Sequence, residues 1–273
     1  MTGFDLGPAL LFCPADRPDR YEKAANRADA VILDLEDAVL PADRAAARVA
    51  LAEHPLDPAT TIVRLNAWGT PDFDADLAAV TATGYRTVML AKTESAAQLD
   101  ALPDGVGVIA LCETARGVLA APEIAAHPSV VALMWGAEDL VASLGGTASR
   151  DANGRYRAVA THARSRVLLA AGASGRAAID SVYLDIADHA GLADEVTDAA
   201  ASGFAATACI HPGQVGIIRA GYAPTEAEIA AARAVLAAAG SEAGVFRFEG
   251  RMVDEPVLRN ARSVLRRAER RGA

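Results

Sequence analysis

The sequence contains few cysteines and no long apolar segment, and both absences exclude classes of protein. Its three cysteines, Cys13, Cys112 and Cys209, show neither disulfide nor metal-ligand spacing, which predicts small buried residues in a reducing compartment. No apolar stretch reaches the roughly 18 residues needed to cross a bilayer. The first residues also lack the basic and apolar regions of a secretory signal. We therefore expect a cytoplasmic protein with no membrane-spanning segment.

Basic residues are in the minority. The chain of 273 residues has 26 Lys and Arg against 35 Asp and Glu, a net charge of -9. This balance argues against a broad nucleic-acid footprint. Only the segment from Arg259 to Arg271 is basic, and we interpret it as a solvated helix face, with contact to a phosphate-bearing ligand or a neighbouring subunit as the alternative. An anionic substrate would have to bind through a local Arg or a metal ion.

Short apolar runs are what the sequence has in abundance. Runs of this length, rich in β-branched residues, are typical of buried parallel strands. Eight of them alternate with Ala-rich segments that we expect to be helical, at Ala9–Cys13, Ala30–Leu35, Thr61–Leu65, Thr87–Ala91, Val106–Cys112, Val130–Trp135, Ala177–Tyr183 and Thr207–Ile210. Eight strands separated by helices is the count that closes a (β/α)8 TIM barrel. The sequence thus predicts one large α/β barrel domain.

Residues at the ends of the expected helices fit this pattern. We expect Asp43 and Asp74 to be N-caps, and Gly84 and Gly203 to stop helices at their C-termini. The stretch Gly145–Gly154 is rich in glycine and polar residues and follows the most charged strand end. It favours a lid or substrate loop as much as a plain connector.

The chain continues beyond the eighth strand. After Pro212 it holds a helical pattern near 225–239, two phenylalanines and a polar turn, which is more pattern than a fraying end would carry. We therefore divide the chain into a barrel, residues 1–222, and a C-terminal extension or lid, residues 223–273, that should dock on another surface.

Two carboxylates, Glu113 and Asp139, follow consecutive strands. Because neighbouring strands lie roughly 4.8 Å apart, carboxylates on adjacent strand ends can share one cation. Two carboxylate ligands favour a hard ion such as Mg²⁺. The alternative is a pair of loop-facing acids bound to nearby Lys or Arg.

Arg64 interrupts a buried run, and a buried Arg must be paired or bound to a ligand. Its planar fork suits a substrate carboxylate, and the alternative is an internal salt bridge to Glu36 or Glu113. Gly136 and Ala137 are small residues whose backbone N–H groups could approach a substrate carboxylate.

The second strand is crowded by Asp34, Glu36 and Asp37, and by alternation one of them should point into the barrel. Asp37, at the strand's end, is our candidate for a residue that supports the site from outside the metal. Lys92 either neutralises this acidic site or serves as a structural counter-ion. His211, before Pro212, is better interpreted as a turn histidine than as a catalytic base.

Eight motifs in order along the chain resemble the citrate lyase β-subunit-like family of the HpcH/HpaI aldolase superfamily, which includes malyl-CoA and citramalyl-CoA lyases. The motifs are Leu11–Pro14, Val31–Val39, Val63–Asn66, Met89–Glu94, Glu113–Val118, Gly136–Leu140, Cys209–Pro212 and Gly250–Pro256.

This resemblance implies a (β/α)8 barrel with Mg²⁺ on Glu113 and Asp139, and Arg64 holding the carboxylate of a keto acid. It also implies that Asp254, in the C-terminal lid, reaches the active site of a neighbouring subunit in a homotrimer or hexamer. The expected catalytic residues are then Asp254, Arg64 and Asp37. The expected substrate-binding residues are Arg64, Glu113, Gly136, Ala137, Glu138 and Lys92.

We expect a Mg²⁺-dependent lyase that cleaves a β-hydroxyacyl-CoA of the citramalyl-CoA or malyl-CoA type into acetyl-CoA and pyruvate or glyoxylate. Asp254 would be the general base. One alternative is a citrate lyase β-subunit that acts on an acyl-carrier-protein thioester within a larger complex. Another, of a different class, is a catalytically silent barrel that serves as a binding or assembly subunit.

Overall fold

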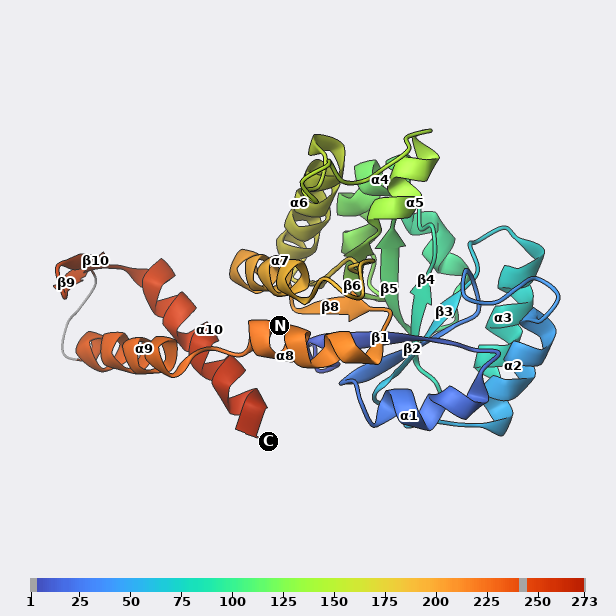
Figure 1. Cartoon of the computed structure of the whole chain (residues 1–273), viewed down its shortest axis with the longest axis horizontal. Helices are drawn as coiled ribbons and strands as arrows, with labels where there is room; N and C mark the ends of the chain where they lie inside the picture. The colour runs from blue at the N-terminus through green and yellow to red at the C-terminus, as the bar shows by residue number, and fades with distance from the viewer. Residues whose placement is uncertain (1–3, 241–244, 273) are drawn as a thin grey trace. The chain divides into compact units, whose positions relative to one another are not determined.

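The computed structural model describes residues 4–240 and 245–272. Eight parallel strands close into a barrel in sequence order, which confirms the predicted fold (Figure 1). The strands are β1 (Ala9–Pro14), β2 (Ala30–Asp34), β3 (Thr61–Leu65), β4 (Thr87–Leu90), β5 (Gly107–Cys112), β6 (Val130–Trp135), β7 (Ala177–Asp180) and β8 (Ala206–Cys209). Seven of them lie within one residue of their predicted bounds, and β7 ends three residues earlier than predicted.

Helices follow the strands and surround the barrel (Figure 1). The α-helices of this part of the chain are α1 (Tyr21–Ala25), α2 (Arg44–Glu53), α3 (Pro71–Thr81), α4 (Ala115–Ala126), α5 (Ala137–Ser143), α6 (Ala158–Ala173), α7 (His189–Ser202) and α8 (Val215–Tyr222). Short 3-10 helices lie at η1 (Pro18–Arg20), η2 (Ala96–Ala101) and η3 (Pro212–Gln214).

The barrel interior is filled by alternate residues of the strands. The buried cluster includes Leu10, Ala30, Ile32, Ile62, Met89, Ile109, Leu111, Ala132, Met134, Ile179, Ala206 and Ala208. Because side chains alternate between the faces of a strand, the next inward position of β2 is Asp34, that of β3 is Arg64, and that after β5 is Glu113. The packed core therefore ends in charged groups at the carboxyl ends of the strands, where barrel enzymes place their active sites.

The start of α3 differs from the prediction. The helix begins at Pro71, and the Thr70 side chain caps it by accepting a bond from the Phe73 N–H. Proline suits this first position because its missing N–H would have no partner there. Asp74 lies inside the first turn, so its assignment as the N-cap is wrong. Asp43 does stand at the N-cap of α2 but makes no capping bond.

Only one of the two predicted helix stops is confirmed. Gly203 ends α7 in the left-handed region, with φ 108°, and the N–H of Phe204 returns to the carbonyl of Ala199. This is the geometry that glycine adopts at the end of a helix. Gly84 does not stop α3, because that helix ends at Thr81.

The chain divides into two compact units, Met1–Ile218 and Arg219–Ala273. In the second unit α9 (Glu226–Ala239) packs on α10 (Glu255–Gly272) around Ala232, Ala261 and Val264. A hairpin of β9 (Phe246–Phe248) and β10 (Arg251–Val253) precedes α10.

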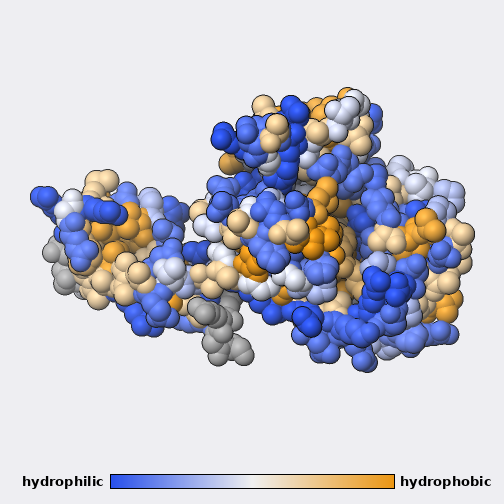
Figure 2. All heavy atoms as spheres, viewed as in Figure 1, coloured by the Kyte–Doolittle hydropathy of each residue, from blue (hydrophilic) through white to orange (hydrophobic). Residues whose placement is uncertain are grey.

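The visible surface is largely hydrophilic with separate apolar patches (Figure 2). Among the described residues, no helix combines the length and apolar character needed to span a membrane. Cys13, Cys112 and Cys209 are buried free thiols, as predicted.

The helix stop at Gly203 yields a stability test. Gly203→Ala forces an L-residue into the left-handed region and should lower the free energy of unfolding by roughly 1–2 kcal/mol. Gly172 supplies the matched control, because it lies in α6 with open space around its Cβ position and no positive φ. Gly172→Ala should raise the free energy of unfolding by about 0.5–1 kcal/mol. Thermal unfolding of both variants measures the difference, and equal shifts would contradict the assignment.

Candidate active site

Charged side chains that follow five consecutive strands meet at the mouth of the barrel, as the sequence predicted. The residues are Asp34, Glu36, Asp37, Arg64, Lys92, Glu113 and Asp139, joined by direct contacts. Five carboxylates thus face two cationic groups, which leaves an excess of negative charge in a partly buried site.

Arg64 is held by Asp34 through two bonds. Nε and Nη2 donate to the two carboxylate oxygens at 2.7 and 2.6 Å. The pair is in register between β2 and β3, and Asp34 also accepts the N–H groups of Glu36 and Ala38. Both side chains are at least nine-tenths buried. The internal ion pair is therefore present, with Asp34 as an additional partner, and the Nε–Nη2 edge of Arg64 is not open to a substrate.

The remaining nitrogen of Arg64 faces the site. Nη1 lies 3.0 Å from Glu36 Oε2 and 3.8 Å from Asp37 Oδ2. Burial opposes the charge of Arg64, but the hydrogen bonds and charges of its acidic neighbours, Asp34 above all, raise its pKa above the ordinary value. Arg64 is thus a permanent cation with one nitrogen directed at the mouth.

Lys92 bridges the acidic groups with both its backbone and its side chain. Its N–H donates to Glu113 Oε1 at 3.0 Å, and its ammonium bonds Glu36 and lies 3.5 Å from Asp139 Oδ1. Its φ of 51° is rare for a residue with a side chain. Such strain persists where surrounding contacts hold it and is concentrated at functional sites. Burial opposes the charge of Lys92, but the bond to Glu36 keeps its pKa raised.

Glu113 is the carboxylate with the most strongly raised pKa in the site. It is 2% exposed, and burial raises its pKa to about 8, with further contributions from the negative charges of Asp139 and Glu36. Gly136 makes room for it, because a Cβ there would lie 2.8 Å from Glu113 Oε2. Gly136 is the next inward position of β6 after Met134, so its small size serves the carboxylate.

Asp139 does not end a strand, which corrects our expectation. β6 ends at Trp135, and Asp139 lies in the first turn of α5, with its side chain 36% exposed. The first turn of α5 nevertheless places the Asp139 carboxylate at the mouth of the barrel, close to Glu113. Gly136 is the N-cap of this helix and Ala137 its first residue.

The other predicted site residues lie around this centre or outside it. The Asp37 side chain lies at the edge of this centre and is 55% exposed. Glu138 accepts a hydrogen bond from Ser149 at 2.5 Å. His211 accepts the Gly213 N–H and caps a turn, as interpreted from the sequence. Asp254 belongs to the second unit, where it accepts the Val257 N–H at the start of α10. Its role against a barrel stays a prediction.

Oxygen donors dominate the site, which fits a hard divalent cation. Glu36 Oε2 is a buried oxygen that accepts no hydrogen bond, although Arg64 Nη1 forms an ion pair with it at 3.0 Å. Glu113 accepts the Lys92 N–H, and no ion pair to it is formed by a Lys or Arg among the described residues. In the described part of the chain, no group of three or more His, Cys, Asp or Glu has a metal-holding arrangement. Glu113 and Asp139 would therefore act as two protein ligands and leave other positions to water and substrate.

Comparison with known proteins gives a consistent set of relatives. The model of the HpcH/HpaI aldolase/citrate lyase family matches residues 9–212. A citrate lyase subunit beta-like protein from Mycobacterium tuberculosis is 58% identical over 262 residues, covering 96% of each chain. A (3S)-malyl-CoA thioesterase from Cereibacter sphaeroides is 34% identical, covering 96% of this chain and 94% of the relative.

A solved structure extends this likeness to three dimensions. The crystal structure of protein CitE from Mycobacterium tuberculosis in complex with magnesium, acetoacetate and coenzyme A has a TM-score of 0.93 to this chain at 58% identity. The match covers 96% of this chain and 98% of that one.

Glu113 makes the stability of the chain depend on pH. With its pKa at about 8, the folded chain retains a proton that the unfolded carboxyl releases near 4.3. Since the folded state then binds more protons, stability is lost as pH rises from about 5 to about 8. We expect the Tm without added metal to fall across this interval. Glu113→Gln, which does not titrate, should flatten the fall, and equal slopes for both proteins would contradict the assignment.

Proposed function

The chain belongs to the HpcH/HpaI aldolase/citrate lyase family as a citrate lyase β-subunit-like enzyme, and we propose that it is a Mg²⁺-dependent lyase of β-hydroxyacyl-CoA thioesters. The resemblance seen in the motifs is thereby confirmed at the level of the family. The proposed reaction cleaves citramalyl-CoA or malyl-CoA into acetyl-CoA and pyruvate or glyoxylate. The observation that carries the proposal is the buried Glu113 beside Asp139 at a mouth with excess negative charge.

Glu113 and Asp139 would hold the metal. Their carboxylate oxygens match the ligand preference of Mg²⁺, and Glu36 Oε2, which accepts no hydrogen bond, lies in the same site. The related CitE protein was crystallised with magnesium, acetoacetate and coenzyme A, which supports the same metal and a thioester substrate here. When bound, Mg²⁺ supplies Lewis-acid polarisation of the substrate oxygen that becomes the keto group.

Arg64 would bind the carboxylate of the keto acid through Nη1. Asp34 occupies the opposite edge of the guanidinium and fixes its plane, so Nη1, which lies beside Glu36, is aimed at the mouth before the substrate arrives. Lys92 adds a second positive charge on the same side. Holding the carboxylate in one orientation lowers the entropic cost of reaching the reactive geometry.

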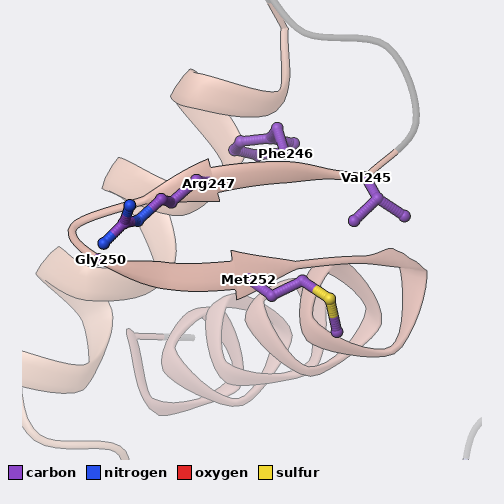
Figure 3. A pocket seen from close by; sticks show the side chains of 5 residues that line it. All are labelled: Val245, Phe246, Arg247, Gly250 and Met252. Carbon is purple, nitrogen blue, oxygen red and sulfur yellow. The ribbon is translucent and has the colours of Figure 1, made fainter.

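Asp254 would be the general base, taking the hydroxyl proton in cleavage or the acetyl methyl proton in condensation. The carboxylates of the mouth already contact Arg64 or Lys92, which supports a base from elsewhere. Asp254 directly follows the β9–β10 hairpin, where a pocket is lined by Val245, Phe246, Arg247, Gly250 and Met252 (Figure 3).

Two apolar residues that line this pocket are open to solvent: Val245 is 66% and Met252 67% exposed. Exposed apolar side chains that gather around one pocket, rather than standing singly, favour docking on another protein surface. We propose that the C-terminal unit acts as a lid on a neighbouring copy in a homotrimer or hexamer, and that it excludes water during reaction.

Three other assignments predict different outcomes. A citrate lyase β-subunit would require a thioester on an acyl carrier protein, and a silent barrel would turn over nothing. The relative named (3S)-malyl-CoA thioesterase suggests a third reaction, hydrolysis of the thioester, which would release free malate and coenzyme A. Identifying the product by mass spectrometry therefore separates these activities.

Purified chain mixed with Mg²⁺, acetyl-CoA and pyruvate or glyoxylate should form citramalyl-CoA or malyl-CoA. Asp139→Ala should abolish both turnover and Mg²⁺ binding measured by calorimetry. Because Asp139 is partly exposed in a first helical turn, its removal should leave the Tm within a few degrees. An Asp139→Ala enzyme with wild-type turnover would rule out the two-carboxylate site.

A shared site requires complementation between chains. Asp254→Ala and Asp139→Ala should each be inactive as pure proteins. After subunit exchange, some sites combine an intact metal centre with an intact Asp254 from the neighbour, and part of the activity should return. Exchange can be confirmed by native mass spectrometry. No recovery despite exchange, or a fully active monomer, would disprove the shared site.

A further inference from the structure

The segment between α5 and α6 is bonded over its second half. Its glycine-rich character suggested a lid or a connector, but Arg150 pairs with Tyr156 in an isolated antiparallel bridge. The Arg157 N–H donates to the Ser149 carbonyl, and the Asp151 N–H to that of Arg155. These bonds make the segment a compact turn.

Arg150 fastens this turn to the barrel. Nη2 lies 2.8 and 3.0 Å from the two carboxylate oxygens of Glu195, on α7. The guanidinium lies 3.7 Å from the ring centre of Tyr156 and 4.9 Å from that of Tyr183. The Tyr156 hydroxyl donates to the same carboxylate at 2.9 Å. We call the Arg150, Tyr156 and Glu195 contacts the clamp.

The ion pair of the clamp is largely withdrawn from water. The side chains of Arg150 and Glu195 are 23% and 16% exposed. Removing one partner of such a pair leaves the other charge uncompensated, which disturbs its surroundings more than the loss of an exposed pair. The turn therefore has one strongly preferred position on the barrel.

The clamped turn touches the chain on the N-terminal side of Asp139 at two points. Ser149 is buried, and its hydroxyl donates to Glu138 Oε1 at 2.5 Å, one residue before Asp139. The Tyr156 ring packs edge-on against Trp135, the last residue of β6, with ring centres 5.1 Å apart. Gly136, which lies between Trp135 and α5, is the N-cap of α5 and provides no side-chain cap to that helix.

We propose that the clamp is a positioning device for Asp139, acting through Ser149 and Glu138 on the first turn of α5. The inference rests on the proposed function, in which Asp139 is a metal ligand. Glu195 and Ser149 touch neither metal nor substrate in this scheme. They set the direction of the carboxylate, as partners behind metal ligands do in general.

The test measures Mg²⁺ affinity by calorimetry for Glu195→Gln, Ser149→Ala and the double variant. Each single change should weaken Mg²⁺ binding about tenfold, the lower end of the range for such supporting residues. Because both residues act along one path, the double variant should bind Mg²⁺ as tightly as the single variant with the lower affinity. Arg155→Ala, at the exposed tip of the same turn, is the matched control and should leave the affinity unchanged.

The possible failures are distinguishable. If the wild-type chain binds Mg²⁺ and both single variants bind it within twofold of wild type, the positioning role is disproved while the metal site stands. If the two effects multiply in the double variant, Glu195 and Ser149 act independently and the shared path is disproved. If the wild-type chain binds no Mg²⁺, the proposed metal site fails, and this inference fails with it.

Discussion

The ion pair of Asp34 and Arg64 is the interaction on which the rest of the site depends. Asp34 accepts two bonds from Arg64 and two from backbone N–H groups, so most of its capacity is used. Arg64 is thereby fixed in place, and Asp34 balances most of its positive charge. Little of that charge is left to balance the carboxylate of Glu113. Burying a carboxylate without a cation is costly, and the raised pKa of Glu113 expresses that cost. A divalent ion would relieve it, which links the fold of the barrel to the proposed chemistry.

The strands were predictable because each is a short apolar run with a polar end. The alternation of inward positions also places Asp34, after Ile32, opposite Arg64, after Ile62. Asp139 was expected at the end of a strand but lies in the first turn of α5. An apolar run does not show at which residue a strand ends and a helix begins. The positive φ of Lys92 and the buried bond of Ser149 depend on tertiary contacts that no local pattern encodes.

Support for Asp139 comes from a region that the sequence showed only as glycine-rich. Arg150 and Glu195 are 45 residues apart, and their contact is created by the closure of the barrel. The proposed metal site and its supporting turn differ in charge. The turn is held by a matched pair, whereas the mouth carries more carboxylates than cationic groups, and a divalent cation would balance that excess.

Glu113 and Asp139 are proposed to share one divalent ion. Diffraction from crystals soaked in Mn²⁺, recorded at the manganese absorption edge, tests this arrangement directly. We expect one strong anomalous peak at about 2.1 Å from an oxygen of each carboxylate. A peak at another site, or no peak between these carboxylates at saturating Mn²⁺, would contradict it.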